Sequence, residues 1–331
     1  MERGLSPETK ALLIHIGSAD IDPSLLPPEL KTTATAGPGA GGSSFFIRSG
    51  SHRVRLSIKP ESPLKVIPWN DGVAVQRDGK IIAYGTLELP LCHCPEQAYI
   101  TVSERCIFDC KFCPVPLLHG KIKTREEIAA MVEAAVEKGS VNAISLTSGV
   151  AESPEKEVAY MVSVVRYLAD RFDLPIGVSV YPTDNSTAEL YSAGAKEIKY
   201  NVETMDRRIF GQVCPNLSLD EILSALQDAV PVFGRNRVSS NFIIGLGETD
   251  ECVQEGVEQL TGLGVIPNLR PISPHPLRKG QISVERPSPS RLMKLTRITR
   301  AALDRNGLDV LVAQTMCLPC TGCDLTPQRD L

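Results

Sequence analysis

The sequence has little of what marks membrane or nucleic-acid-binding proteins. None of its apolar runs approaches the roughly 20 residues that a membrane-spanning helix needs. Its 35 Lys and Arg residues are balanced by 39 Asp and Glu residues and form no basic block, which argues against a main role on nucleic acid. We therefore expect a globular protein with one main domain and additions, and with no membrane or nucleic-acid partner.

The N-terminal segment MERGLSPETK lacks the pattern of a secretory signal peptide, so we expect a cytoplasmic protein. Cysteine, in contrast, is abundant: the 331 residues include ten of them. In a reducing compartment such usage indicates metal binding or catalysis rather than disulfides.

Three of these cysteines lie close together in the run CIFDCKFCP, directly after a short apolar segment. Cys106, Cys110 and Cys113 are spaced Cys-x3-Cys-x2-Cys, and Phe112 precedes the last of them. Three thiolates can hold three irons of a 4Fe–4S cluster and leave the fourth iron open, whereas a structural cluster usually takes four cysteines. A structural zinc is the alternative, although zinc fingers more often combine paired cysteines with a fourth ligand at a set distance.

A second triplet, spaced Cys-x2-Cys-x2-Cys, ends eight residues before the C-terminus and consists of Cys317, Cys320 and Cys323. It is a candidate for a second, auxiliary 4Fe–4S cluster, with a fourth ligand from elsewhere or none. Cys92 and Cys94, in LCHCPE, are candidates to complete it. The alternatives are a zinc site or a thiol-rich tail without metal, and ordinary loop cysteines at positions 92 and 94.

The remaining candidates are single residues. His93, between Cys92 and Cys94, is a weaker ligand candidate than either cysteine. Cys214 and Cys252 lie in helical contexts, where lone cysteines are more often small apolar core residues.

Between about residues 97 and 275, strand-like segments alternate with amphipathic helical ones, which predicts a parallel sheet with right-handed crossovers. Six such units fit an α/β fold of the partial TIM-type (β/α)6 barrel kind, in which chemistry collects at the C-terminal strand ends. The expected strands cover residues 98–103, 142–147, 175–180, 196–202, 237–245 and 265–272. The expected helices cover residues 124–138, 154–171, 184–193, 218–229 and 249–263.

The flanks of the barrel have a different character. Residues 32–44 are rich in Gly and small residues, which predicts a flexible loop or linker. Residues 45–90 alternate apolar and polar residues, with hairpin turns expected at Asp71-Gly72 and Asp78-Gly79. A helix over residues 289–306 and a strand at LDVLVAQ lead to the C-terminal cysteines. The predicted division is a β-rich N-terminal element (1–90), the barrel (91–285) and a C-terminal helix with a Cys-rich tail (286–331).

From roughly residue 95 to 275 the chain resembles the radical S-adenosylmethionine (SAM) enzymes, whose signature is Cys-x3-Cys-x2-Cys with an aromatic residue before the last cysteine. The resemblance implies that Cys106, Cys110 and Cys113 are the cluster ligands and catalytic residues. It also implies that SAM chelates the open iron through its amino and carboxylate groups. An electron, from a donor such as ferredoxin, would then cleave SAM to a 5′-deoxyadenosyl radical that abstracts hydrogen.

Three later segments resemble the SAM-binding strands of this superfamily in order. NAISLTSGV stands where the family usually has a Gly-Gly-Glu-like segment, and this departure is tolerable because backbone oxygens do the binding. KEIKYNVETMDRRIF and NFIIGLGETDE resemble the fourth and fifth strands of biotin and lipoyl synthases, with ribose contacts at the former and adenine contacts at the latter. The SAM-binding residues that the resemblance implies are Phe112, Thr147, Ser148, Gly149, Asn201, Glu203, Arg207, Gly245, Gly247 and Glu248.

Arg207 would pair with the SAM carboxylate through its planar fork, and Arg208 is the alternative. Either arginine could instead lie on a solvated helix face. VIPNLRPISPHPL resembles the sixth strand of biotin and lipoyl synthases, so Arg270 and His275 are expected near its C-terminal end.

The second triplet is similar to the auxiliary clusters of the sulfur-inserting branch, in which the cluster donates sulfide to a carbon radical. The layout departs from lipoyl synthase, whose auxiliary cysteines precede the barrel, and from biotin synthase, which lacks a Cys-rich C-terminal tail. It most resembles the archaeal two-protein lipoyl synthases, which implies an octanoyl carrier protein and a paralogous radical SAM subunit as partners. The alternatives are a maturase or modifying enzyme whose auxiliary cluster relays electrons or binds substrate, and a non-catalytic iron–sulfur partner protein.

Overall fold

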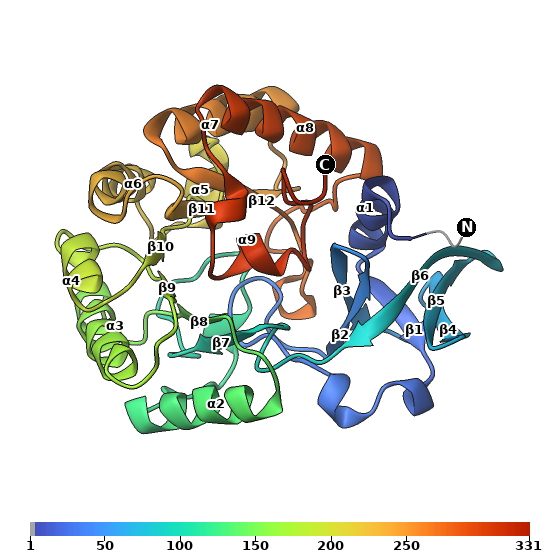
Figure 1. Cartoon of the computed structure of the whole chain (residues 1–331). Helices are drawn as coiled ribbons and strands as arrows, with labels where there is room; N and C mark the ends of the chain where they lie inside the picture. Colours follow the sequence, from blue (N-terminus) through green and yellow to red (C-terminus); the bar gives the residue numbers. More distant parts are fainter. Residues whose placement is uncertain (1–3) are drawn as a thin grey trace.

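The computed structural model describes residues 4–331, so the first three residues of the expected N-terminal element lie outside the described residues. It contains a six-stranded sheet in the order β12-β11-β10-β9-β8-β7 and a closed barrel in the order β1-β3-β2-β6-β5-β4. Figure 1 shows the six-stranded sheet curled inside a ring of helices, with the small barrel beside it. The predicted partial (β/α)6 barrel with a β-rich N-terminal element and a Cys-rich tail is thereby confirmed.

The strands of the large sheet are all parallel and follow the order of the sequence. They are β7 (Gln97–Thr101), β8 (Ala143–Thr147), β9 (Ile176–Ser179), β10 (Glu197–Lys199), β11 (Val238–Ile244) and β12 (Ile266–Pro271). The helices between them are α2 (Arg125–Lys138), α3 (Pro154–Ala169), α4 (Ser186–Ser192), α5 (Arg207–Val213), α6 (Leu219–Phe233) and α7 (Asp250–Leu263). Every predicted strand and helix of this region is present, and α5 is an addition.

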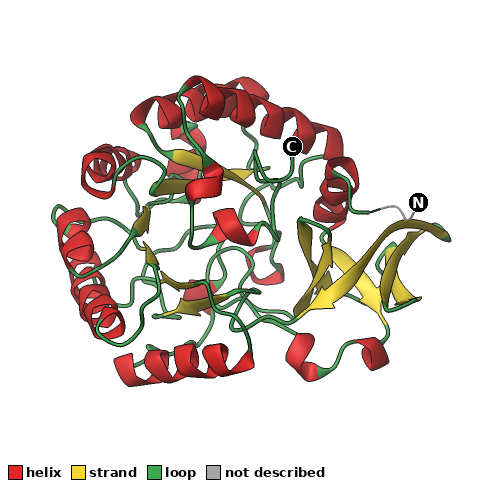
Figure 2. Cartoon of the chain, in the orientation of Figure 1, coloured by secondary structure: helices red, strands yellow, loops and turns green. Residues whose placement is uncertain are grey.

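Local sequence signals explain where these helices start. At α2, the side chain of Thr124 accepts a hydrogen bond from Glu127 N while the Glu127 carboxylate accepts one from Thr124 N, a capping box. Ser153, Ser218 and Thr249 cap α3, α6 and α7 in the same position. The helix α6 runs four residues past its predicted end, to Phe233. Pro231 lies in its last turn and does not end the helix. Figure 2 shows the resulting arrangement, with the helices that connect the strands lying outside the sheet.

The small barrel is more regular than the sequence predicted. It comprises β1 (Ser18–Ile21), β2 (Ser44–Ser49), β3 (His52–Ile58), β4 (Leu64–Trp69), β5 (Gly72–Arg77) and β6 (Lys80–Glu88), preceded by α1 (Pro7–Ile16). Neither α1 nor β1 was expected, and β1 closes the barrel by pairing with both β3 and β4.

One of the two predicted hairpin turns of the small barrel is confirmed and the other is displaced. Asp78 and Gly79 join β5 to β6 with φ values of 51° and 74°, as a tight two-residue turn requires. The turn between β4 and β5 consists of Asn70 and Asp71, because Trp69 pairs with Gly72. The prediction of an Asp71-Gly72 turn was therefore wrong by one residue.

The Gly-rich segment over residues 32–44 is a loop, and it packs against the large sheet. Thr35 Oγ1 donates a hydrogen bond to Thr101 Oγ1 at 2.8 Å, at the end of β7. Thr32 Oγ1 donates to the His93 carbonyl at 2.9 Å. Since β7 is an edge strand of the open sheet, the small barrel and this loop lie beside the seam of the large barrel.

After α8 (Pro289–Arg305), the chain turns back toward the centre of the large barrel. The segment LDVLVAQ forms a 3-10 turn over Val310–Val312 instead of the expected strand, because Asp309 caps Leu311 N and Gln328 accepts from Val310 N. The short helix α9 (Cys317–Cys320) then lies in the middle of the ring (Figure 1).

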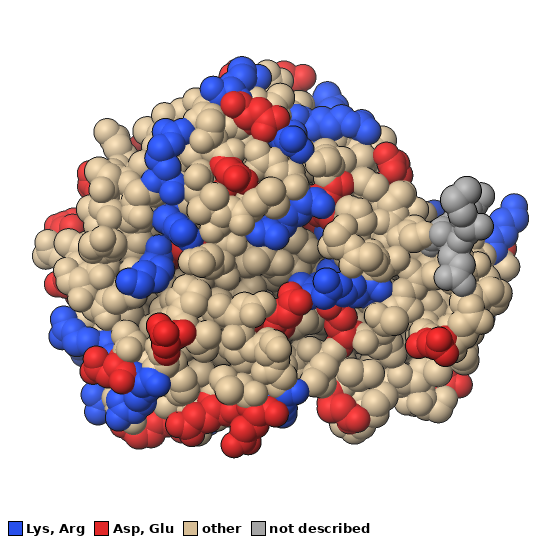
Figure 3. All heavy atoms as spheres, viewed as in Figure 1, with Lys and Arg blue, Asp and Glu red and all other residues tan. Residues whose placement is uncertain are grey.

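The face shown in Figure 3 mixes acidic and basic side chains, with acidic ones gathered along the lower edge over α2. Among the described residues, no helix is long and apolar enough to cross a bilayer.

Candidate active site

Both cysteine triplets line the same cavity, which has a volume of about 510 Å³. The first triplet follows β7 at the C-terminal end of the sheet, where active sites lie in barrels of this kind. The second comes from the tail, which enters the large barrel from the opposite strand ends. The cavity therefore separates two groups of thiols inside one barrel.

The loop that carries the first triplet is clamped to the rest of the barrel. Arg278 donates through Nε to the Cys113 carbonyl and through Nη1 to the Asp109 carboxylate, both at 2.7 Å. Lys111 N donates to the Val213 carbonyl at 2.8 Å. The Arg278 side chain is 4% exposed, so these contacts fix the thiols at the cavity wall. Sequence reasoning missed Arg278, since only its position beyond β12 brings it to this loop.

The chemistry of this donor set fits a 4Fe–4S cluster. Burial raises the pKa of Cys113 to about 12 and also raises the pKa of Cys106, so these thiols need a cationic partner to ionise. Backbone N–H groups of Val150 and Phe108 bond Cys106 and oppose this rise in its pKa. Such N–H donors are the kind of neighbour that supports cluster thiolates.

Cys214 also belongs to this neighbourhood, although the sequence predicted an ordinary core residue. It is 1% exposed at the end of α5, and a hydrogen bond with the Cys110 thiol is the first cause of its raised pKa. The sequence indicated that Cys214 is buried. Its proximity to Cys110 could not be predicted, because it depends on how the end of α5 packs against the loop that carries the first triplet.

Six of the expected SAM-binding residues line the cavity beside the first triplet: Phe112, Thr147, Ser148, Gly149, Asn201 and Glu203. A side chain at position 149 would clash with the Arg105 carbonyl, so glycine lets β8 approach the cysteine loop. Glu203 has φ 58°, and burial raises its pKa to about 7.

The other four expected SAM-binding residues are placed elsewhere. Arg207 is 65% exposed and pairs with Asp220 at 2.6 Å on the outer surface, since Asp206 caps α5 and turns its first residue outward. Its neighbour Arg208 is also exposed. The resemblance implied that Arg207 would reach the SAM carboxylate, and in this structure it does not face the cavity.

The turn after β11 is organised around a buried carboxylate. Glu248 accepts hydrogen bonds from Gly245 N and Leu246 N, both at 2.8 Å, and pairs with Arg291 at 3.0 Å. Gly245 and Gly247 have φ values of 109° and 104°, which L side chains rarely adopt. These three residues thus shape the turn, and the cavity is lined instead by Asn241 and Ile243 of β11.

The tail is held in the barrel by side chains at the starts of the strands. Glu197 accepts from Gln314 N and Thr315 N, each at 2.9 Å. Gln97 accepts from Met316 N at 2.8 Å, and its own amide donates to the Met316 carbonyl at 3.0 Å. A side chain at Gly177 would clash with Thr315, so this glycine makes room for the tail.

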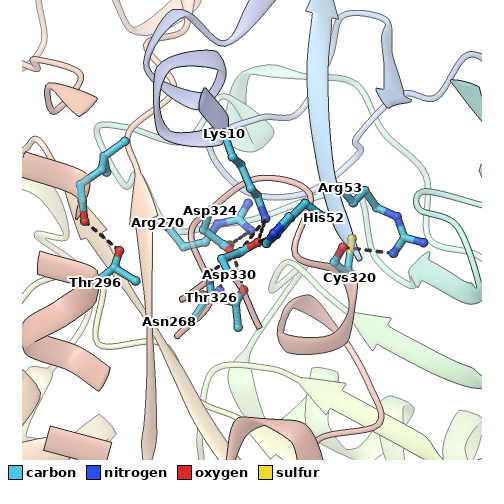
Figure 4. A network of polar contacts seen from close by, with 11 residues as sticks. Lys10, His52, Arg53, Asn268, Arg270, Thr296, Cys320, Asp324, Thr326 and Asp330 are labelled. Atoms are coloured by element: carbon cyan, nitrogen blue, oxygen red, sulfur yellow. Dashed lines mark hydrogen bonds and ion pairs between the residues drawn. The ribbon is translucent and has the colours of Figure 1, made fainter. Parts of the chain in front are cut away.

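Polar contacts from the small barrel hold the far end of the tail (Figure 4). Asp330 is 3% exposed and pairs with the fully buried Lys10 at 2.7 Å. It also contacts His52 Nδ1 at 2.9 Å. The Cys320 carbonyl accepts from Arg53 at 3.2 Å. None of these partners was predicted from the sequence.

Within the tail, Cys320 lies against Cys94, and both are buried with Phe46 and Tyr99. A hydrogen bond from the Cys94 thiol, helped by Arg53, lowers the pKa of Cys320 to about 7. Cys92 points away, and its thiol contacts the Met131 carbonyl of α2 at 3.8 Å. Of the two candidates to complete the second triplet, the structure brings only Cys94 to it.

Cationic side chains surround the second triplet. Lys199 is 3% exposed and donates to Cys317 Sγ at 3.6 Å. Arg270 pairs with Asp324 at 2.9 Å, and the thiols of Cys323 and Cys317 help to raise its pKa. His93 also lines the cavity but adds no positive charge, because burial lowers its pKa to about 3. Positive charge so close to thiols suits a negatively charged iron–sulfur cluster.

No group of three or more His, Cys, Asp or Glu residues between positions 4 and 331 is arranged to hold a single metal ion. A 4Fe–4S cluster gives each thiolate its own iron, and its ligands are consequently more widely spaced than those of one ion.

Comparisons with known proteins identify the family of the large barrel and its fold. Residues 100–260 match the model of the radical SAM superfamily. A curated relative, GTP 3′,8-cyclase 2 of Pseudomonas aeruginosa, is 24% identical over 163 residues, which make up 48% of this chain and 48% of the relative. The chain thus spans about half the length of this curated relative.

Two solved structures share the fold. A radical SAM methyltransferase from Sphaerobacter thermophilus has a TM-score of 0.54 and 20% identity, covering 75% of this chain and 76% of the other. Methylornithine synthase has a TM-score of 0.52 and 19% identity, covering 61% of each chain. At this level of identity the similarity establishes the fold of the barrel.

Proposed function

We propose that this chain, a radical SAM enzyme by its domain over residues 100–260, inserts sulfur at an unactivated carbon of its substrate. The superfamily implies a 4Fe–4S cluster and SAM, which together supply a 5′-deoxyadenosyl radical that takes a hydrogen atom from the substrate. The observation that carries the proposal is the single cavity that both cysteine triplets line. A carbon radical formed there would lie between the two metal sites.

The residues of the first site have distinct tasks in this proposal. Cys106, Cys110 and Cys113 hold the SAM cluster, while Phe112, Thr147, Ser148 and Gly149 form the adjoining wall. Asn201 and Glu203 face the same space from beyond β10, within reach of a nucleoside. Arg207, Gly245, Gly247 and Glu248 act indirectly at most, through the shape of α5 and of the turn after β11.

Cys317, Cys320, Cys323 and Cys94 hold the auxiliary cluster in this proposal. This cluster would supply the sulfide and accept the electron that remains when the new C–S bond forms. Lys199 and Arg270 stabilise the thiolates. The tail fills the end of the large barrel where its strands start and so keeps water out of the cavity from that side. Cys92 takes no part, because its thiol faces α2.

The proposed substrate is an octanoyl group on a carrier protein, and the proposed partners are a paralogous radical SAM subunit and a ferredoxin-type electron donor in the cytoplasm. The test is anaerobic reconstitution with isotopically heavy sulfide, followed by turnover with SAM, dithionite and an octanoylated carrier peptide. Mass spectrometry should detect heavy sulfur in the peptide. Formation of 5′-deoxyadenosine without any thiolated peptide contradicts the lipoyl-type reaction.

A second candidate is a modifying enzyme whose auxiliary cluster relays electrons. It is favoured by the place of Cys94 beside Cys320, since a fourth thiol leaves no open iron to bind substrate. The same labelling experiment separates the two functions, because a relay cluster keeps its heavy sulfide through repeated turnovers.

A further inference from the structure

One wall of the cavity comes from the small barrel rather than from the large sheet. Arg55, Ser57 and Lys59 line the cavity together with residues 37–39 of the Gly-rich loop. Side chains two residues apart on a strand share a face, so one face of β3 and its extension supply all three. The backbone of Arg55 is fixed to the tail, since Arg55 N donates to the Gly322 carbonyl at 2.6 Å.

A second arginine, Arg286, reaches the same wall from the segment between β12 and α8. Its Nη2 donates to the Ile14 carbonyl at 2.7 Å. Its guanidinium packs so closely on Gly17 that a side chain there would clash with it. The Gly17 carbonyl in turn accepts from Ser57 N at 3.1 Å, which sets Arg286 beside β3.

Both arginines have a hydrogen-bond donor directed at no protein acceptor. Within the part of the chain that the structure describes, Nε of Arg55 and Nε of Arg286 are buried without a hydrogen-bond partner. A buried donor left unpaired is unfavourable, and such groups in native proteins are usually satisfied by a ligand or by water. Guanidinium groups pair best with carboxylates and phosphates, which accept two parallel N–H bonds.

The charges of the cavity lining point to the same kind of ligand. Its cations are Arg55, Lys59, Lys199, Arg270 and Arg286, whereas Glu203 is the one acidic residue among the described lining residues. Lys199 and Arg270 already face the second triplet and Asp324. In the described part of the chain, neither Arg55 nor Arg286 pairs with a carboxylate, and the one anionic neighbour of Arg286 is the Cys323 thiol, which opposes the lowering of its pKa by burial.

We propose that Arg55 and Arg286 form an oxyanion-binding site for a carboxylate or phosphate group of the molecule that the radical attacks. This inference rests on the proposed function in one respect, which is that a second molecule binds in the cavity beside SAM. It assigns a substrate-recognition role to the small barrel. Because this barrel packs beside the open edge of the large sheet, Arg55 of β3 lines the cavity. The anionic group would be a part of the substrate separate from the carbon that the radical attacks.

The test measures binding of inorganic pyrophosphate and of octanoate by calorimetry, using anaerobically reconstituted full-length protein saturated with SAM. At least one probe should bind saturably, and the two arms separate phosphate from carboxylate recognition. Arg55→Gln and Arg286→Gln should each weaken that binding about tenfold or more, whereas Arg286→Lys, which keeps the charge without the fork, should be intermediate. Arg77→Gln, on the outer side of the small barrel, is the matched control and should bind as the wild type does.

Two readouts separate this site from the SAM site and from the clusters. Arg55→Gln and Arg286→Gln should keep the wild-type iron content and the wild-type rate of 5′-deoxyadenosine formation from SAM alone. The inference is overturned if neither probe binds, if binding survives in both Gln variants, or if saturating SAM abolishes it. Loss of iron or of SAM cleavage in the variants would equally overturn it, because the arginines would then serve a cluster or SAM.

Discussion

The two cysteine triplets have nearly the same spacing but very different surroundings. The first lies on a loop at the C-terminal strand ends, held by Arg278, and faces open space in the cavity. The second lies in a tail packed into the barrel, next to two cations. Each triplet has a further thiol beside it, Cys214 at the first and Cys94 at the second. Sequence spacing alone makes the two triplets look interchangeable, whereas the first lies on a clamped loop and the second is packed among cations inside the barrel.

The largest effect is expected when one thiol is removed from each triplet, which tests whether the two triplets have separate roles. Cys110→Ser should lower 5′-deoxyadenosine formation from SAM by about a thousandfold or more, since the reaction depends wholly on this cluster. Cys320→Ser should keep most of that activity while losing about four irons per chain. Product analysis by chromatography and iron counting on the two variants provide the measurement. Equal losses of SAM cleavage in both would show that the triplets form one functional unit.

Breaking the anchor of the tail should affect stability strongly. Lys10→Met leaves the buried Asp330 carboxylate unpaired and is expected to lower the free energy of unfolding by about 3–5 kcal/mol in urea titrations. The double variant Lys10→Met/Asp330→Asn should recover part of that loss. Arg297→Met, which removes an exposed pair with Glu8 at 4.0 Å, is the control and should change stability by less than about 1 kcal/mol. A Lys10→Met protein as stable as this control would contradict the anchoring role.

The two cysteines that precede β7 test whether the second triplet has a fourth ligand. Cys94→Ser should reduce the iron bound at the second site and change its electron paramagnetic resonance spectrum, because Cys94 contacts Cys320. Cys92→Ser is the matched control, since its thiol faces Met131, and it should behave as the wild type does. The outcome that counts against a fourth thiol ligand is a wild-type spectrum in Cys94→Ser.

The smallest expected effect concerns the carboxylate near the first triplet. Burial raises the pKa of Glu203 to about 7, above its value in the unfolded chain, so the folded state binds the extra proton. Its contribution to stability therefore falls as pH rises from about 4.5 to 7. Glu203→Gln should gain stability over the wild type on going from pH 5.5 to pH 8, on the order of 1–2 kcal/mol in anaerobic urea titrations. The exposed Glu189→Gln should show no such trend, and a flat difference for Glu203→Gln would refute the raised pKa.

The large barrel could be predicted well because its signals are local. Alternation of apolar strands and amphipathic helices, with Ser or Thr at helix starts, placed each β/α unit within a few residues. The first triplet and residues 147–149, 201 and 203 all line the cavity, as the motifs implied, since each lies at the C-terminal end of a strand or in the loop that follows it. Chain position along a parallel strand is enough to predict which end of the sheet a residue occupies.

The failures involve contacts between distant parts of the chain. Closure of the small barrel depends on β1, a four-residue strand whose partners lie more than 35 positions later. The contact between Cys94 and Cys320, the clamp by Arg278 and the exposed position of Arg207 are set by how separate segments pack. Local patterns carry no information about such packing, so these residues could be found only in the folded structure.

The pairing of Lys10 with Asp330 joins positions separated by 320 residues. Such a contact can form only after the segment around Asp330 has been synthesised, whereas the β/α units pack with their sequence neighbours as they appear. Assembly of the proposed second metal site is thus expected to be a late event, because the tail thiols reach Cys94 only after the tail has packed into the finished barrel. A tag fused behind Leu331 would hinder this step, so iron loading of recombinant protein is expected to depend on which terminus carries the tag.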